Sequence, residues 1–127
     1  MISESGIYLV NPRGPKLRPL DLDKRRINKV AKVNEDFIKF GKSERPLWNR
    51  HRDYKKIFGD DVKFVPVVIM NNQVKLRSFE SYISPLFDEY KISNPNSSRK
   101  LEWLKGISFE DAEKKILDAL KNFEQNN

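Results

Sequence analysis

The sequence predicts an α/β protein of the α+β type, in which helices flank a central sheet of about three strands. Its 127 residues suit one domain, and no internal repeat or linker divides residues 1–127. Three short apolar runs have the length of strands, and they lie at residues 7–10, 37–41 and 62–70. Three longer segments carry apolar residues at helical spacing, and they lie at residues 46–58, 76–90 and 108–124.

The first strand is followed by a segment of very different composition. Ile7 to Val10 is an apolar run, and two prolines and a glycine within residues 12–15 end it in a turn. Residues 13–33 are strongly basic and form an insert before the second strand. A thin apolar stripe in this insert predicts a helix from Asp21 to Val33. The stripe consists of Leu22, Ile27, Val30 and Val33.

A strand, a helix and another strand occupy the middle of the chain. The run at residues 37–41 is apolar around Lys39, and alternation places this lysine on the same face as Phe37 and Gly41. Pro46 suits a first helical turn and Gly59 ends the helix. One face of this helix carries Leu47, Arg50, Tyr54 and Ile57. Pro66 in the third strand indicates that one side of that strand is not fully paired.

The last third of the chain is predicted to contain a helix, a loop and a second helix. The first apolar stripe runs from Leu76 to Tyr90, and Pro85 predicts a kink or break within it. Residues 91–99 are polar and rich in turn formers, which indicates a loop. Ser108 is a suitable cap for the final helix, which we expect over residues 108–124.

Composition narrows the classes of function. The chain has 25 basic and 18 acidic residues, which gives a net charge of +7. This excess favours a protein that binds a polyanion such as nucleic acid over one whose lysine-rich surface is only solvated. The absence of cysteine excludes a disulfide scaffold, a thiolate zinc site and a cysteine nucleophile, and fits a cytoplasmic protein. We expect neither a secretion signal nor a membrane span, because no apolar run is long enough.

Several short motifs occur in a fixed order along the chain. Gly6-Ile7-Tyr8 lies on the first strand, and Lys39-Phe40-Gly41 on the second is followed by Lys42-Ser43. Arg50 precedes Tyr54 by four residues on a helix, Glu80 lies on the helix after the third strand, and Glu102-Trp103 comes later. This ordered set resembles the GIY-YIG nuclease superfamily, in particular a branch from phages and bacteria with lysine at the second motif tyrosine. The resemblance extends from Gly6 to Gly106.

The resemblance implies a DNA endonuclease that depends on Mg²⁺ or Mn²⁺, with five catalytic residues. Tyr8 would orient or deprotonate the attacking water, and since a free phenol has a pKa of about 10, Lys39 and Arg50 would have to lower that pKa. Arg50 would clamp the scissile phosphate with Tyr54 one turn later, because its planar fork matches two phosphate oxygens. Arg52 is the less favoured alternative to Arg50. Glu80 would hold the metal, with Glu89 as its alternative.

The remaining basic residues would grip the DNA backbone without reading sequence. The expected nucleic-acid-binding residues are Lys24, Arg25, Arg26, Lys42 and Arg52. Asn94 and Asn96 are both candidates for a late asparagine of the superfamily, and the sequence does not choose between them. His51, the single histidine, is expected on the helix surface. A non-catalytic nucleic-acid-binding module on the same scaffold is the alternative function.

Overall fold

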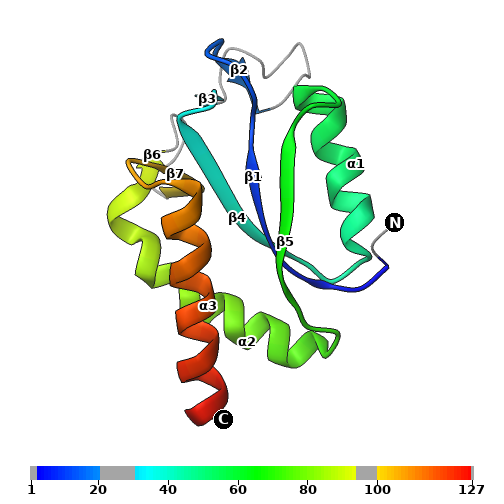
Figure 1. Ribbon diagram of the computed structural model, residues 1–127, viewed down its shortest axis with the longest axis vertical. Helices are drawn as coiled ribbons and strands as arrows, with labels where there is room; N and C mark the ends of the chain where they lie inside the picture. Colours follow the sequence, from blue (N-terminus) through cyan, green and yellow to red (C-terminus); the bar gives the residue numbers. More distant parts are fainter. Residues whose placement is uncertain (1–2, 21–30, 94–99, 127) are drawn as a thin grey trace.

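The computed structural model describes residues 3–20, 31–93 and 100–126, and these contain a five-stranded sheet with helices on both faces (Figure 1). The larger elements, in chain order, are β1 (Gly6–Asn11), β4 (Phe37–Ser43), α1 (Leu47–Phe58), β5 (Lys63–Ile69), α2 (Gln73–Ile83), the 3-10 helix η1 (Ser84–Tyr90), β7 (Lys100–Lys105) and α3 (Phe109–Asn126). The shorter strands are β2 (Arg18–Pro19), β3 (Lys32–Val33) and β6 (Lys91–Ser93). The prediction of a mixed α and β fold is therefore confirmed. None of the helices in the described ranges could span a membrane.

The strand order of the sheet is β5-β1-β4-β7-β6, so the first strand of the chain lies between two later ones. All of these pairs are antiparallel, and Tyr8 lies opposite Gly41 of β4 and Pro66 of β5. Because β5 is at the edge of the sheet, the missing N–H of Pro66 can face outward without breaking a ladder. The prediction that this strand is paired incompletely is confirmed.

The predicted sheet of about three strands was too small. β7 pairs with β4, with Trp103 opposite Lys39, and β6 pairs with β7, so the polar segment after Tyr90 begins as a strand rather than a loop. In the basic insert, β2 and β3 form a two-stranded ribbon with Arg18 opposite Val33. The helix predicted from Asp21 to Val33 therefore does not reach its predicted end, and residues 21–30 lie outside the described ranges.

The predicted helix boundaries agree closely with the observed ones. α1 begins after Pro46 and ends at Gly59, whose φ of 96° is strained for any residue with a Cβ atom. α2 gives way to η1 just before Pro85, where the proline ring cannot continue an α-helix, so the predicted break is confirmed. Ser108 caps α3 by accepting a hydrogen bond from the Asp111 amide at 3.0 Å, and the helix runs to Asn126, beyond the predicted end.

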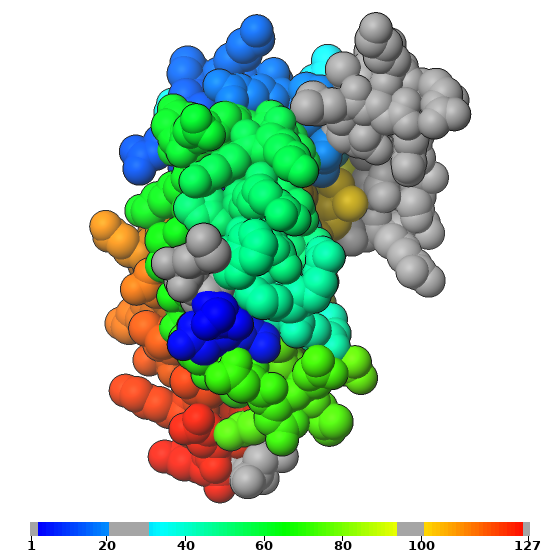
Figure 2. Space-filling model, turned by 90° about the vertical axis from the view of Figure 1, so that its right-hand side faces the viewer, coloured from blue at the N-terminus to red at the C-terminus, as the bar shows by residue number. Residues whose placement is uncertain are grey.

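Two apolar clusters lie on opposite faces of the sheet. Strand residues such as Leu9, Ile38 and Phe40 pack under α2, η1 and α3. The strand residues that alternate with them face α1 and form the second cluster together with residues of that helix. This cluster includes Tyr8, Val10, Phe37, Tyr54, Phe58 and Trp103. Figure 2 views the molecule from the α1 side, with residues 3–5 between α1 and α2. The carbonyl of Glu4 there accepts a hydrogen bond from the Leu47 amide at 2.9 Å and fixes the start of α1.

Candidate active site on the α1 face of the sheet

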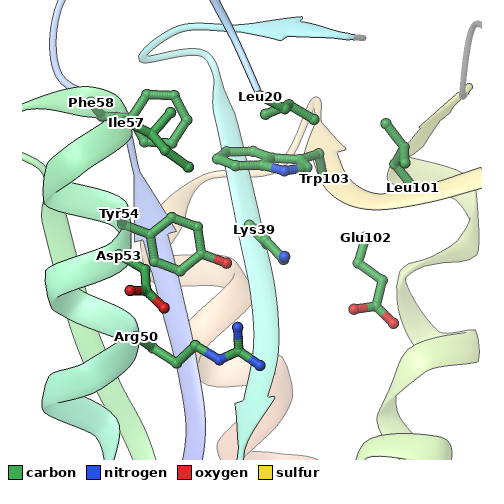
Figure 3. A pocket seen from close by; sticks show the side chains of 10 residues that line it. All are labelled: Leu20, Lys39, Arg50, Asp53, Tyr54, Ile57, Phe58, Leu101, Glu102 and Trp103. Atoms are coloured by element: carbon green, nitrogen blue, oxygen red, sulfur yellow. The ribbon is translucent and has the colours of Figure 1, made fainter. Parts of the chain in front are cut away.

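A pocket of about 540 Å³ lies between α1, β4 and β7, a size typical of small-molecule sites. Figure 3 shows that its side chains are sorted by polarity: the charged groups and the Tyr54 hydroxyl lie toward one end, and aliphatic and aromatic groups lie at the other. The charged residues are Lys39, Arg50, Asp53 and Glu102. The others are Leu20, Tyr54, Ile57, Phe58, Leu101 and Trp103.

Both motif glycines are required by close packing. A Cβ atom at Gly41 would lie 2.6 Å from the Tyr8 hydroxyl oxygen and 2.8 Å from its ring carbon Cζ. The ring of Tyr8 therefore extends across the backbone of β4 on the α1 face. At Gly6 a Cβ atom would collide with the carbonyl oxygen of Val68 on β5. The glycines of both strands thus allow close approach of other groups, and one of those groups is the candidate catalytic tyrosine.

Tyr8 and Tyr54 form a buried pair behind the pocket. Their hydroxyl oxygens are 2.9 Å apart and hydrogen-bonded, and their rings meet edge to face with centroids 5.7 Å apart. Tyr8 is 2% exposed and Tyr54 8%. The first motif and the helix motif, 46 residues apart in the chain, are therefore in direct contact.

The environment of Tyr8 overturns the expectation that its pKa is lowered. Burial raises the pKa of the Tyr8 phenol, and the neighbouring Tyr54 raises it further. Lys39 and Arg50 do lower this pKa, as expected, but their effect is smaller than that of burial, so the net shift is upward. Burial also raises the pKa of Tyr54. In this arrangement both phenols stay protonated at neutral pH and act as hydrogen-bonding groups.

Arg50 and Lys39 are the cations of the pocket. Arg50 extends from α1 toward the open space, and its buried Nε has no hydrogen-bond partner among the described residues (Figure 3). The Lys39 ammonium lies 5.6 Å from the centroid of the Tyr54 ring. Arg52, the alternative to Arg50, is exposed and lies over the ring of Trp48, outside the pocket. Of the two arginines, only Arg50 is placed to receive an anion in the pocket.

Glu80 lies beside the pocket rather than in its lining. It is half-buried on α2, and burial raises the pKa of its carboxyl, with a further rise from the negative charge of Glu102. Lys42, through its charge and its backbone N–H, and Lys39 act in the opposite direction and lower this pKa. Glu80 is therefore in electrostatic contact with Lys39 of the pocket, whereas the alternative Glu89 is exposed and interacts with Tyr90.

Glu102 is a pocket residue to which the sequence assigned no catalytic role. It comes from β7 and lines the pocket opposite Arg50, and its charge acts on Glu80 (Figure 3). The sequence signal for Glu102 was its place in the Glu-Trp pair of the motif set. Trp103 joins the buried cluster under α1, while Glu102 stays half-buried at its edge.

The described residues suit a divalent metal that is held mainly by one glutamate, which is the arrangement that the resemblance implies. Within the described ranges, no group of three or more histidine, aspartate or glutamate side chains is placed to hold a metal ion. Glu80 would be the principal protein ligand, with Glu102, whose charge acts on it, as a second carboxylate. That donor set suits Mg²⁺, which commonly keeps several waters and is held by one or two carboxylates and by substrate phosphate.

Lys42 and His51 are described by the structure and do not line this pocket. The ammonium of Lys42 bonds the Glu44 carboxylate at 3.0 Å, and His51 stacks on Phe64 with ring centroids 4.8 Å apart. Burial lowers the pKa of His51, and the nearby charge of Lys55 adds to this effect. The remaining predicted residues lie outside the described ranges, and these are Lys24, Arg25, Arg26, Asn94 and Asn96.

Comparison with known proteins gives no family for this chain. No protein-family model, curated protein or solved structure matches it. A function must therefore be argued from the pocket itself and from the motifs that supply its residues.

Proposed function

We propose that this protein is a metal-dependent endonuclease of the GIY-YIG type that hydrolyses phosphodiester bonds of DNA in the cytoplasm. One observation carries the proposal: side chains from the three motifs converge on one side of the sheet. Tyr8, Lys39 and Arg50 come from β1, β4 and α1, and Tyr54 joins them from α1. The chemistry of phosphodiester hydrolysis needs this combination of cations and hydrogen-bonding hydroxyls close together.

Arg50 and Lys39 would bind the scissile phosphate. The Nε of Arg50 has no hydrogen-bond partner within the part of the chain that the structure describes, so an arriving phosphate oxygen would satisfy this buried donor. Lys39 of β4 adds a second positive charge to the pocket lining. Two preorganised cations in a partly desolvated pocket stabilise the charge that develops on the phosphoryl oxygens.

Tyr8 would act through its hydroxyl as a hydrogen-bonding group that orients water. Its raised pKa means that the proton stays on the phenol at neutral pH. Tyr54 is the partner that holds the Tyr8 hydroxyl in position, at 2.9 Å. Glu80 would hold Mg²⁺ or Mn²⁺ with help from Glu102, and a bound divalent ion supplies Lewis-acid stabilisation of a phosphoryl oxygen.

The second candidate function is a non-catalytic nucleic-acid-binding module with the same pocket. The protonated, buried state of Tyr8 favours this alternative, because a protonated phenol cannot remove a proton from the attacking water. The two functions share binding of DNA and differ only in turnover. An assay of cleavage therefore separates them.

The test is nicking of supercoiled plasmid with Mg²⁺ or Mn²⁺, compared with the same reaction in EDTA. We expect cleavage only with metal, and we expect Glu80→Ala to abolish it while DNA binding is kept or improved, since a negative charge facing phosphate is removed. Glu89→Ala is the matched control, because Glu89 is exposed and lies in η1 rather than in α2. DNA binding without cleavage under all these conditions would favour the non-catalytic module.

A further inference from the structure

The apolar end of the pocket has no part in the proposed chemistry, and it adjoins the cations directly (Figure 3). We propose that this end receives the base of an unpaired nucleotide, while Arg50 and Lys39 hold the adjoining phosphate. This inference rests on the proposed function and specifies its substrate class as DNA with an unpaired base at the site of action.

The floor of the apolar end is preformed. The ring of Phe58 packs edge-on against Trp103 with centroids 5.7 Å apart, and these side chains are 1% and 4% exposed. They would not have to be ordered when a ligand arrives, which reduces the entropic cost of binding. Leu20, Ile57 and Leu101 are half-buried around them, so apolar surface remains for a ligand to cover.

The ligand that suits this lining is apolar at one end and anionic at the other. A nucleotide has this composition, because its base offers a π-face and its phosphate carries the charge. The carboxylate of Glu102 lies along the same pocket, where it would accept a hydrogen bond from an N–H group of a base, such as the ring N3–H of thymine or the exocyclic amino group of cytosine. The volume of about 540 Å³ lies within the range of pockets that enclose small ligands.

A base that is stacked and paired in a duplex cannot enter such a pocket. Enzymes that act on bases reach them by using single strands or by extruding the nucleotide from the helix. The same constraint applies here, because the floor formed by Phe58 and Trp103 lies within the protein rather than on its surface. The pocket therefore favours single-stranded or locally unpaired DNA over continuous duplex.

Binding of oligonucleotides in EDTA tests this inference without any need for cleavage. The probes are oligo(dT) and an abasic deoxyribose-phosphate oligomer of equal length, which carry the same phosphates. We expect oligo(dT) to bind about tenfold more tightly, because the contribution of one stacked base is of that order. In a Trp48→Phe variant the single remaining tryptophan is Trp103, and its fluorescence should change with oligo(dT) and not with the abasic oligomer.

Leu101→Ala, which trims the half-buried rim, should remove most of the preference for oligo(dT). Leu117→Ala on α3 is the matched control and should keep it, because Leu117 is exposed and distant from the pocket lining. Equal affinity for the two oligomers, with no change in Trp103 fluorescence, would overturn the base pocket even if plasmid cleavage is observed. A clear preference for oligo(dT) without any cleavage would overturn the nuclease and leave the base pocket in place.

Discussion

The ring of Tyr8 lies across the backbone of Gly41, its register partner on the neighbouring strand. No other residue type fits at position 41 without displacing this ring, since even a Cβ atom would be 2.6 Å from the Tyr8 hydroxyl oxygen. The contact explains why glycine follows Lys39 and Phe40 in the second motif. It also directs the Tyr8 hydroxyl toward Tyr54 on α1.

Gly41→Ala is expected to destabilise the fold by about 1–3 kcal/mol, because overpacking forces the Tyr8 ring or β4 to move. Chemical denaturation of the single variant measures this cost. The matched background is Tyr8→Ala, in which the opposing ring is absent and Gly41→Ala should cost much less. An equal cost in both backgrounds would show that the glycine is required for a reason other than the ring.

Tyr8→Phe and Tyr54→Phe should each cost about 1–3 kcal/mol of stability, since each leaves one buried hydroxyl without its partner. The double variant removes both groups and should cost less than the sum of the single variants.

For activity, we expect Tyr8→Phe to lose cleavage under the proposed function. Retained cleavage in Tyr8→Phe would remove the hydroxyl of Tyr8 from the mechanism.

Arg50→Lys keeps the positive charge and loses the guanidinium fork, so turnover should fall much more than affinity for DNA. Arg52→Lys is the natural control on the same helix, because that residue is exposed and outside the pocket. Single-turnover kinetics and filter binding on both variants give the comparison. Parallel losses of turnover and affinity in Arg50→Lys would restrict its role to binding.

Stability at low pH should depend on Glu44. Hydrogen bonds from Arg77, at 2.6 and 3.0 Å, and from Lys42, at 3.0 Å, lower the pKa of the Glu44 carboxyl from 4.5 to about 2. Because the folded state lowers this pKa, the contribution of Glu44 is present above pH 4.5 and is lost as the pH falls toward 2.

Glu44→Gln should therefore lower stability at neutral pH and flatten the decline between these two pH values. Glu124→Gln, an exposed substitution on α3, is the control. Thermal denaturation across this pH range gives the measurement. A decline in Glu44→Gln that is as steep as in the wild-type protein would place the acid-sensitive group elsewhere.

The elements with strong local signals were predicted well, and those that depend on distant partners were not. Apolar runs and caps identified β1, β4, β5 and the three α-helices, because burial and turn residues are visible in the sequence. β7 contains charged residues at both ends and becomes a strand by pairing with β4, more than 60 residues earlier in the chain. Such pairing leaves little trace in a single sequence.

The site shows the same division between local and long-range information. The four-residue spacing of Arg50 and Tyr54 correctly placed both on the pocket side of α1. The pKa of Tyr8 was wrongly expected to be lowered, because the sequence reveals nearby cations and not the depth at which the phenol is buried. The place of Glu102 in the pocket, opposite Arg50, could not be predicted, because it depends on the long-range pairing of β7 with β4.

The position of β1 between β5 and β4 has a consequence for how the protein is made. Residues 6–11 are synthesised more than 50 residues before residues 63–69 of β5, which form one of their two hydrogen-bonding partners. Translation to that point takes on the order of seconds. Throughout that interval the apolar segment of β1 lacks its β5 partner, and an apolar strand with an unpaired edge is prone to pair with other chains.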